Sequence, residues 1–178
     1  MTIAVNLYGA PGSGKSSGAS YVFSQLKLNG INCEYVSEFA KDKCWEGNKN
    51  IFSIPENQFY IGANQFYRMS SLLDKVDVIV TDSPIFLNSF YNKSDILGEE
   101  YNKIMLGLSD MFFNINFYVN RVKPYFPKGR NQTKEQADSM DIELRKYLKN
   151  KIDYIEVNGD KDGYNRILEF VFECLKKD

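Results

Sequence analysis

Residues 9–16 read Gly9-Ala10-Pro11-Gly12-Ser13-Gly14-Lys15-Ser16 and match the pattern G-x-x-x-x-G-K-[ST] at every fixed position. The apolar run before them, Ile3 to Tyr8, predicts a buried strand, and the residues from Ser16 onward predict a helix. In this context glycines let successive backbone N–H groups point at phosphate oxygens, and the start of the helix adds its positive dipole. The pattern therefore predicts a phosphate-binding loop for a nucleoside triphosphate. The alternative is an ordinary glycine turn before a helix.

The same pattern gives the residues of the loop their expected roles. Lys15 is expected to reach the β- and γ-phosphates, and the Ser16 hydroxyl to hold Mg²⁺. The expected contacts to ATP within this segment are Gly9, Ala10, Gly12, Ser13, Gly14, Lys15, Ser16 and Ser17. The predicted cofactors are therefore ATP and Mg²⁺.

Length and composition narrow the class of protein. The chain has 178 residues and a net charge of −1, which fits one domain over residues 1–178 and gives no overall attraction to nucleic acid. No apolar run is long enough to span a membrane and no secretion signal is present, so we expect a cytoplasmic protein without a membrane partner. The three cysteines match no zinc or redox pattern. Histidine is absent, so acid–base chemistry has to come from carboxylates.

Strand and helix signals alternate along the chain. The expected strands are 2–8, 32–37, 76–81, 114–119 and 153–157. The expected helices are 15–29, 38–44, 55–74, 99–109, 133–148 and 163–176. Thr133 and Gln136 are spaced as a capping box at the start of one helix. The alternation predicts an α/β fold, a three-layer sandwich with a five-stranded parallel sheet.

Two carboxylates come directly after predicted strands, at the edge where ligands of such sheets bind. Asp82 follows the strand 76–81, where phosphate-loop proteins place an acidic residue near Mg²⁺, although an ordinary turn residue is the alternative. Glu38 follows the second strand and is a candidate general base, although an N-cap or first-turn acid favoured by the helix dipole is equally consistent. The sequence leaves open which of the two accepts a proton.

A loop at 120–132 is predicted to reach the same edge and to act as a short lid. It carries cationic and aromatic side chains, namely Arg121, Lys123, Lys128, Arg130, Tyr125 and Phe126. Cations that close over ATP neutralise charge on the transferred phosphoryl group, so Arg121 and Arg130 are candidate catalytic residues and Lys128 a candidate ATP contact. The alternatives are a solvated basic loop and a patch that binds single-stranded nucleic acid.

The helix 55–74 contains a short repeat, Asn57-Gln58-Phe59-Tyr60 and Asn64-Gln65-Phe66-Tyr67. A shift of seven residues is about two turns, so both copies lie on nearly the same face. The phenylalanines are expected to pack on the sheet. The polar members Gln58 and Gln65, together with Arg68, are candidate substrate-binding residues at the edge of the sheet.

Residues Asn92-Lys93-Ser94-Asp95 match the N-K-x-D pattern with which GTPases read guanine. That motif should end a buried strand, and no strand is predicted between Pro84 and Asn92. We therefore interpret these residues as a turn of chance composition.

Together, several segments resemble small P-loop kinases of the nicotinamide-riboside-kinase-like group, and within it phage-encoded members that include hydroxymethyluracil DNA kinases. The segments are the glycine loop, Ser37-Glu38-Phe39-Ala40, the glutamine-bearing helix, Thr81-Asp82-Ser83 and Lys128-Gly129-Arg130-Asn131-Gln132-Thr133. The resemblance implies a P-loop kinase fold with a five-stranded parallel core. It also implies an acidic base near Glu38 or Asp82, and a lid arginine at Arg121 or Arg130.

The expected function is transfer of the γ-phosphoryl group of ATP to a hydroxyl of a nucleoside, a nucleotide or a modified base such as hydroxymethyluracil in DNA. Alternatives are a nicotinamide riboside or deoxynucleotide kinase, an ATPase switch, and a nucleotide-binding regulator without turnover. The sequence leaves the acceptor open, and it is consistent with either a monomer or a dimer.

Overall fold

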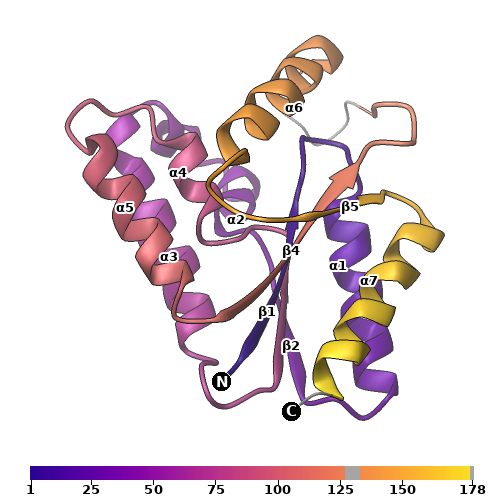
Figure 1. The fold of residues 1–178 in the computed structure, drawn as a ribbon. Coiled ribbons are helices and arrows are strands. Elements are labelled where there is room, and N and C mark those ends of the chain that lie inside the picture. The colour runs from indigo at the N-terminus through magenta and orange to yellow at the C-terminus, as the bar shows by residue number, and fades with distance from the viewer. Residues whose placement is uncertain (127–132, 177–178) are drawn as a thin grey trace.

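A central parallel sheet of five strands organises the computed structural model, which describes residues 1–126 and 133–176 (Figure 1). The strands are β1 (Ile3–Tyr8), β2 (Cys33–Val36), β3 (Val78–Thr81), β4 (Phe113–Asn120) and β5 (Ile155–Asn158). Their order across the sheet is β2-β3-β1-β4-β5, and every neighbouring pair is parallel. The predicted α/β class and the five parallel strands are thus confirmed.

The middle strand, β1, is flanked by β3 and β4. Asn6 of β1 is in register with Thr81 on one side and with Asn116 on the other. All residues of β1 and β3 are buried, as expected for parallel strands covered on both faces. Because the strands run the same way, the loop after β1 and the residue after β3 emerge at the same edge, which we call the carboxyl edge of the sheet.

Helices cover both faces of the sheet, an arrangement compatible with a three-layer sandwich (Figure 1). On one face, α1 (Lys15–Leu28) and α7 (Lys161–Leu175) enclose a large apolar core with alternate residues of the strands. On the other face lie α3 (Gln58–Ser70) and α5 (Gly98–Ser109). Near the carboxyl edge of that face, α4 (Leu87–Tyr91) and α6 (Lys134–Leu148) pack in a separate apolar cluster.

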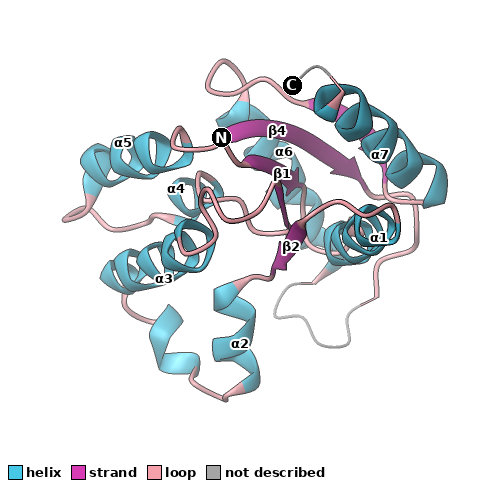
Figure 2. Ribbon diagram, turned by 90° about the horizontal axis from the view of Figure 1, so that it is seen from below, coloured by secondary structure: helices cyan, strands magenta, loops and turns pink. Residues whose placement is uncertain are grey.

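The short helix α2 (Phe39–Trp45) follows β2 and contacts α3. Seen from below, it projects away from the sheet beside α3 (Figure 2). Two 3₁₀ helices, η1 (Lys49–Phe52) and η2 (Pro55–Asn57), connect α2 to α3. Across the described residues, none of the helices has both the length and the apolar composition needed to cross a membrane.

Two helices differ from the sequence-based expectation. The helix expected over 55–74 begins as η2 and ends at Ser70, and Asp74 has a φ of 57°, which an α-helix does not accommodate. The second difference is α4, which lies in a segment where no helix was expected. At α6 the prediction is confirmed, because Thr133 and Gln136 form the reciprocal hydrogen bonds of a capping box.

Candidate functional site

The loop between β1 and α1, residues 9–16, is called the glycine loop here. Gly9 has a φ of 143°, and a Cβ added to it would lie 2.7 Å from the Val119 carbonyl oxygen. Gly14 has a φ of 103°, and a Cβ there would lie 2.5 Å from the hydroxyl oxygen of Tyr164. That hydroxyl donates to the Gly14 carbonyl at 2.9 Å. Glycine is therefore required at both positions, by backbone conformation and by the close approach of β4 and α7.

Lys15 folds back over the glycine loop. Its Nζ donates to the carbonyl oxygens of Gly9 at 2.6 Å and Ala10 at 3.1 Å. The Ser13 hydroxyl is buried in the same loop and has no hydrogen-bond partner among the described residues. An ammonium group and a buried hydroxyl thus lie beside the amino end of α1, an electrostatic setting that favours an anion.

Ser16 and Asp82 are in direct contact. The Ser16 hydroxyl, in the first turn of α1, donates to Asp82 Oδ2 at 2.5 Å. Asp82 is only 3% exposed, and its other oxygen, Oδ1, has no hydrogen-bond partner among the described residues. Two residues that the sequence assigned to one metal site are therefore brought together from different elements.

Glu38 precedes the first residue of α2 and occupies its N-cap position. Its carboxylate makes no capping hydrogen bond to that helix. Burial raises the pKa of the Glu38 carboxyl above its ordinary value, the nearby ammonium of Lys15 opposes this shift, and the charge of Asp82 adds to it. Glu38 is therefore within electrostatic reach of both Lys15 and Asp82, as expected from their shared edge.

Two tyrosines lie close enough to Asp82 and Glu38 for these carboxylates to affect their pKa values, although the sequence did not single them out. Burial, followed by the charge of Asp82, raises the pKa of Tyr35. Partial burial, followed by the charge of Glu38, raises the pKa of Tyr91, a residue that is 38% exposed. No local motif marks either residue, because aromatic side chains next to strands and in helices are usually core residues.

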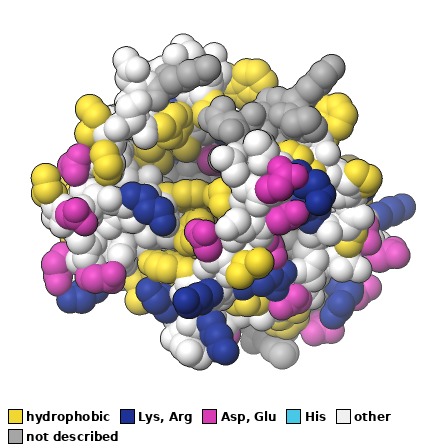
Figure 3. Space-filling view, turned by 90° about the horizontal axis from the view of Figure 1, so that it is seen from above, with side chains coloured by type: hydrophobic (Ala, Val, Ile, Leu, Met, Phe, Trp, Pro, Cys, Tyr) yellow, Lys and Arg dark blue, Asp and Glu magenta, His cyan; other side chains and the backbone are white. Residues whose placement is uncertain are grey.

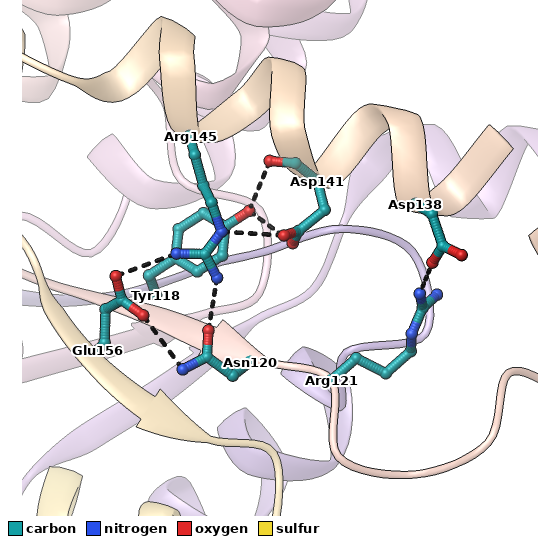
Figure 4. A network of polar contacts seen from close by, with 7 residues as sticks. All are labelled: Tyr118, Asn120, Arg121, Asp138, Asp141, Arg145 and Glu156. Atoms are coloured by element: carbon teal, nitrogen blue, oxygen red, sulfur yellow. Dashed lines mark hydrogen bonds and ion pairs between the residues drawn. The ribbon is translucent and has the colours of Figure 1, made fainter. Parts of the chain in front are cut away.

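Arg121 follows β4 directly and lies against the glycine loop. Its guanidinium forms an ion pair with Asp138 of α6 (Figure 4). It also approaches the Pro11 carbonyl at 3.5 Å and lies 5.4 Å from the centre of the Tyr125 ring. A Cβ on Gly12 would lie 3.0 Å from the same tyrosine ring. The first residues after β4 therefore cover the tip of the glycine loop.

The three candidates on α3 have different surroundings. Gln58 donates through Nε2 to Asn88 of α4 at 3.0 Å. Gln65 is buried, and its Oε1 accepts from the backbone N–H of Phe39 at 2.9 Å. Arg68 pairs with Asp42 at 2.6 Å and lies over the Phe39 ring. Gln58 thus faces α4, whereas the other two are engaged with α2.

The remaining candidates are placed as follows. Ala10 is buried and Ser17 is exposed on the first turn of α1. Lys128 and Arg130 lie outside the described residues, as does most of the second half of the expected lid. The face formed by the carboxyl edge is hollowed near its centre, and hydrophobic side chains gather around the hollow (Figure 3).

A polar network that sequence reasoning missed lies where β4 and β5 end (Figure 4). Arg145 of α6 bonds to Asp141 at 2.9 Å, to Glu156 at 3.0 Å and to Asn120 at 2.5 Å. Its guanidinium also lies 3.9 Å from the centre of the Tyr118 ring. This network fixes the end of β4 immediately before Arg121. Its members come from three separate elements, so no spacing in the sequence reveals it.

The residues that match the guanine-reading pattern form a turn after α4. The side-chain oxygen of Asn92 accepts from the Ser94 N–H, and the Ser94 hydroxyl donates to Glu56 at 2.6 Å. They follow a helix rather than a buried strand, which agrees with their interpretation as a turn.

Neither the models of known protein families nor the curated protein sequences give a match to this chain. A function for the chain is therefore proposed from the residues at the carboxyl edge and from the motifs quoted above.

Proposed function

We propose that this chain is an ATP-dependent kinase that transfers the γ-phosphoryl group to a hydroxyl of a nucleoside, a nucleotide or a modified base such as hydroxymethyluracil in DNA. One observation carries the proposal, the contact between Ser16 of the glycine loop and the buried Asp82. It joins a loop suited to phosphate with a carboxylate suited to a cation, and Glu38 lies within electrostatic reach.

The glycine loop binds the phosphates of ATP in this proposal. Lys15 exchanges its two loop carbonyl acceptors for phosphate oxygens. Ser16 and Asp82 offer a hydroxyl and a carboxylate oxygen, the donor types that Mg²⁺ takes from proteins at nucleotide sites. Asp82 Oδ1, which has no hydrogen-bond partner in residues 1–126 and 133–176, fits this role, because a buried carboxylate oxygen without a partner is unfavourable. When bound, Mg²⁺ would neutralise charge on the β- and γ-phosphate oxygens.

Glu38 is the base in this proposal. It accepts the proton of the acceptor hydroxyl, the hydroxyl oxygen bonds to the γ-phosphorus, and the bond to the β,γ-bridging oxygen breaks, so that ADP leaves. Burial raises the pKa of Glu38, which makes its carboxylate a better proton acceptor. Asp82 already accepts a hydrogen bond from Ser16, which favours Glu38 over Asp82 for this role.

In the proposal, Arg121 and the acceptor lie on opposite sides of the transferred γ-phosphoryl group. The Arg121 guanidinium beside Pro11 stabilises charge that spreads over the transferred phosphoryl oxygens. The acceptor lies toward α4, where Tyr91 is close enough to Glu38 for their charges to interact. Asn88 is one turn before Tyr91 on the same helix face and pairs with Gln58.

Incubation with γ-labelled ATP and separate pools of acceptors tests the proposal. The pools are nucleosides, nucleotides, nicotinamide riboside, unmodified DNA and hydroxymethylated DNA. The proposal expects label in one pool, dependent on Mg²⁺. Steady release of inorganic phosphate that no pool changes would identify an ATPase instead, and ATP binding without turnover would identify a regulator. Either of these two outcomes would overturn the proposal.

A further inference from the structure

Gln65 and Glu38 are linked through a single backbone amide. Gln65 is 1% exposed on α3, and its Oε1 accepts from the N–H of Phe39 at 2.9 Å. Phe39 is the first residue of α2, so its N–H is one of those that no residue within the helix can accept. The acceptor is therefore provided by another helix.

An N-cap side chain ordinarily accepts a hydrogen bond from the first turn of its own helix. Glu38 occupies the N-cap position of α2, yet its carboxylate makes no such bond. At the opposite end of the chain, the Asp160 carboxylate of α7 does make it, to the N–H of Gly163 at 2.9 Å. The carboxylate of Glu38 is thus available for interactions outside α2, whereas that of Asp160 is used in capping.

The amide of Gln65 has one orientation that satisfies this contact. The Phe39 N–H requires an oxygen, so Nε2 is directed elsewhere, and it is buried without a hydrogen-bond partner among the described residues. An apolar side chain of similar size would avoid that unpaired amide nitrogen, but it would leave the Phe39 N–H without its acceptor. The bond to α2 is therefore the contact that the buried amide makes.

The position of Glu38 determines which charges it meets. The charged groups that influence the pKa of Glu38 are Lys15, Asp82, Lys41 and Asp42, and the charge of Glu38 in turn influences the pKa of Tyr91. Lys41 and Asp42 belong to α2 itself, whereas Lys15, Asp82 and Tyr91 lie on other elements, so a small shift at the start of α2 changes the distance from Glu38 to these three. General-base catalysis is sensitive to such shifts, because the base must be within hydrogen-bond reach of the acceptor hydroxyl.

We propose that Gln65 is a positioning residue that holds the start of α2 from outside and so keeps the Glu38 carboxylate directed at the reacting hydroxyl. This rests on the proposed function, and it replaces the substrate-binding role that the sequence predicted for Gln65. Gln65 acts through the backbone of Phe39 and does not touch the acceptor.

The test compares Gln65→Met, which keeps the length but removes the acceptor oxygen, with Gln65→Glu, which keeps an oxygen facing Phe39. Hydrogen exchange of the Phe39 amide should accelerate in Gln65→Met and remain slow in Gln65→Glu. The kcat for transfer should fall about 10- to 100-fold in Gln65→Met, with ATP affinity unchanged. Gln65→Glu should recover most of the rate. Gln65→Leu serves as a second apolar replacement if Gln65→Met does not fold.

Tyr101→Phe is the matched control, because the Tyr101 hydroxyl donates to the Gln58 carbonyl at 2.8 Å, a hydrogen bond to α3 that does not involve α2. It should lower the melting temperature and leave kcat unchanged.

A raised acceptor KM with unchanged kcat in Gln65→Met would show direct substrate contact and overturn the inference. Provided that the wild type transfers the phosphoryl group, faster hydrogen exchange of the Phe39 amide in Gln65→Met with no fall in kcat would also overturn the inference. If the wild type phosphorylates no acceptor, the proposed function fails first and the role for Gln65 fails with it.

Discussion

The Ser16 hydroxyl donates to Asp82 Oδ2 across 2.5 Å and so joins the first turn of α1 to the end of β3. The two residues are 66 positions apart in the sequence, and both lie at the carboxyl edge of the sheet. This contact brings a hydroxyl from the glycine loop to a carboxylate whose other oxygen, Oδ1, has no partner in the part of the chain that the structure describes. It is the structural basis of the metal-assisted phosphate chemistry proposed above.

Asp82→Asn should impair Mg²⁺-dependent transfer without unfolding the protein. Asparagine keeps an oxygen that accepts from the Ser16 hydroxyl, but it lacks the negative charge that a divalent cation requires. We expect transfer to fall by about 10²-fold or more and the Mg²⁺ concentration for half-maximal rate to rise. A magnesium titration at saturating ATP measures both. An unchanged magnesium requirement would show that Asp82 does not take part in binding the cation.

Glu38→Gln should slow transfer strongly and stabilise the fold at neutral pH. The pKa of Glu38 is raised in the folded state, so folding favours the protonated carboxyl. Protonated Glu38 therefore stabilises the fold at low pH, and this contribution is lost as pH rises through the folded pKa. Because glutamine does not ionise, Glu38→Gln should have the higher melting temperature at pH 7, whereas near pH 4 the two proteins should have similar melting temperatures. Thermal unfolding at the two pH values measures this. The rate should fall about 10²- to 10⁴-fold, and in the wild type it should decline as acid protonates Glu38. Equal melting temperatures at pH 7 would contradict the account.

Gly9→Ala should destabilise the protein more than Gly30→Ala. Both glycines have positive φ, 143° and 78°, but a Cβ at Gly30 meets nothing within 4 Å, whereas one at Gly9 lies 2.7 Å from the Val119 carbonyl. Gly30→Ala should lower the free energy of unfolding by about 1 kcal/mol, and Gly9→Ala by about 3 kcal/mol or more. Urea unfolding gives both values. Only Gly9→Ala should also lose ATP binding. A similar loss of unfolding free energy in the two variants would contradict the close approach of β4 to Gly9.

Arg121→Ala should lower kcat about 10²-fold and change the free energy of unfolding by less than about 1 kcal/mol. The ion pair with Asp138 is partly exposed, so its loss removes little stability, whereas charge stabilisation beside the glycine loop is lost entirely. Lys134→Ala is the control, because Lys134 pairs with the same carboxylate at 3.3 Å from an exposed position. A large loss of stability with an unchanged rate would mean that Arg121 is structural.

Most of the fold follows from local pattern. The buried run Ile3–Tyr8 and the helix after the glycine loop have clear signals, and the spacing of Thr133 and Gln136 gives the start of α6. The helix α4 was missed because Pro84 breaks the pattern and five residues are too short to show a period. The end of α3 was placed too late because apolar residues continue past Ser70, and the left-handed conformation of Asp74 has no signal in the sequence.

The site is predictable where topology decides it. Parallel strands end at one edge of the sheet, so Glu38 and Asp82 lie near the glycine loop regardless of how the helices pack. The contact of Gln65 with Phe39 depends on how α2 and α3 pack, and periodicity places a polar residue on a face without saying which atom it meets. The same holds for Arg145, whose partners come from β4, α6 and β5.

In the proposed reaction the glycine loop delivers the γ-phosphoryl group of ATP to an acceptor hydroxyl. Label transfer from γ-labelled ATP should be compared between the wild type and Lys15→Met, which keeps most of the length of the side chain and removes its charge. We expect label on one acceptor pool with the wild type and a loss of about 10²-fold or more with Lys15→Met, while circular dichroism shows both to be folded. Equal transfer by the two proteins would contradict the proposed reaction.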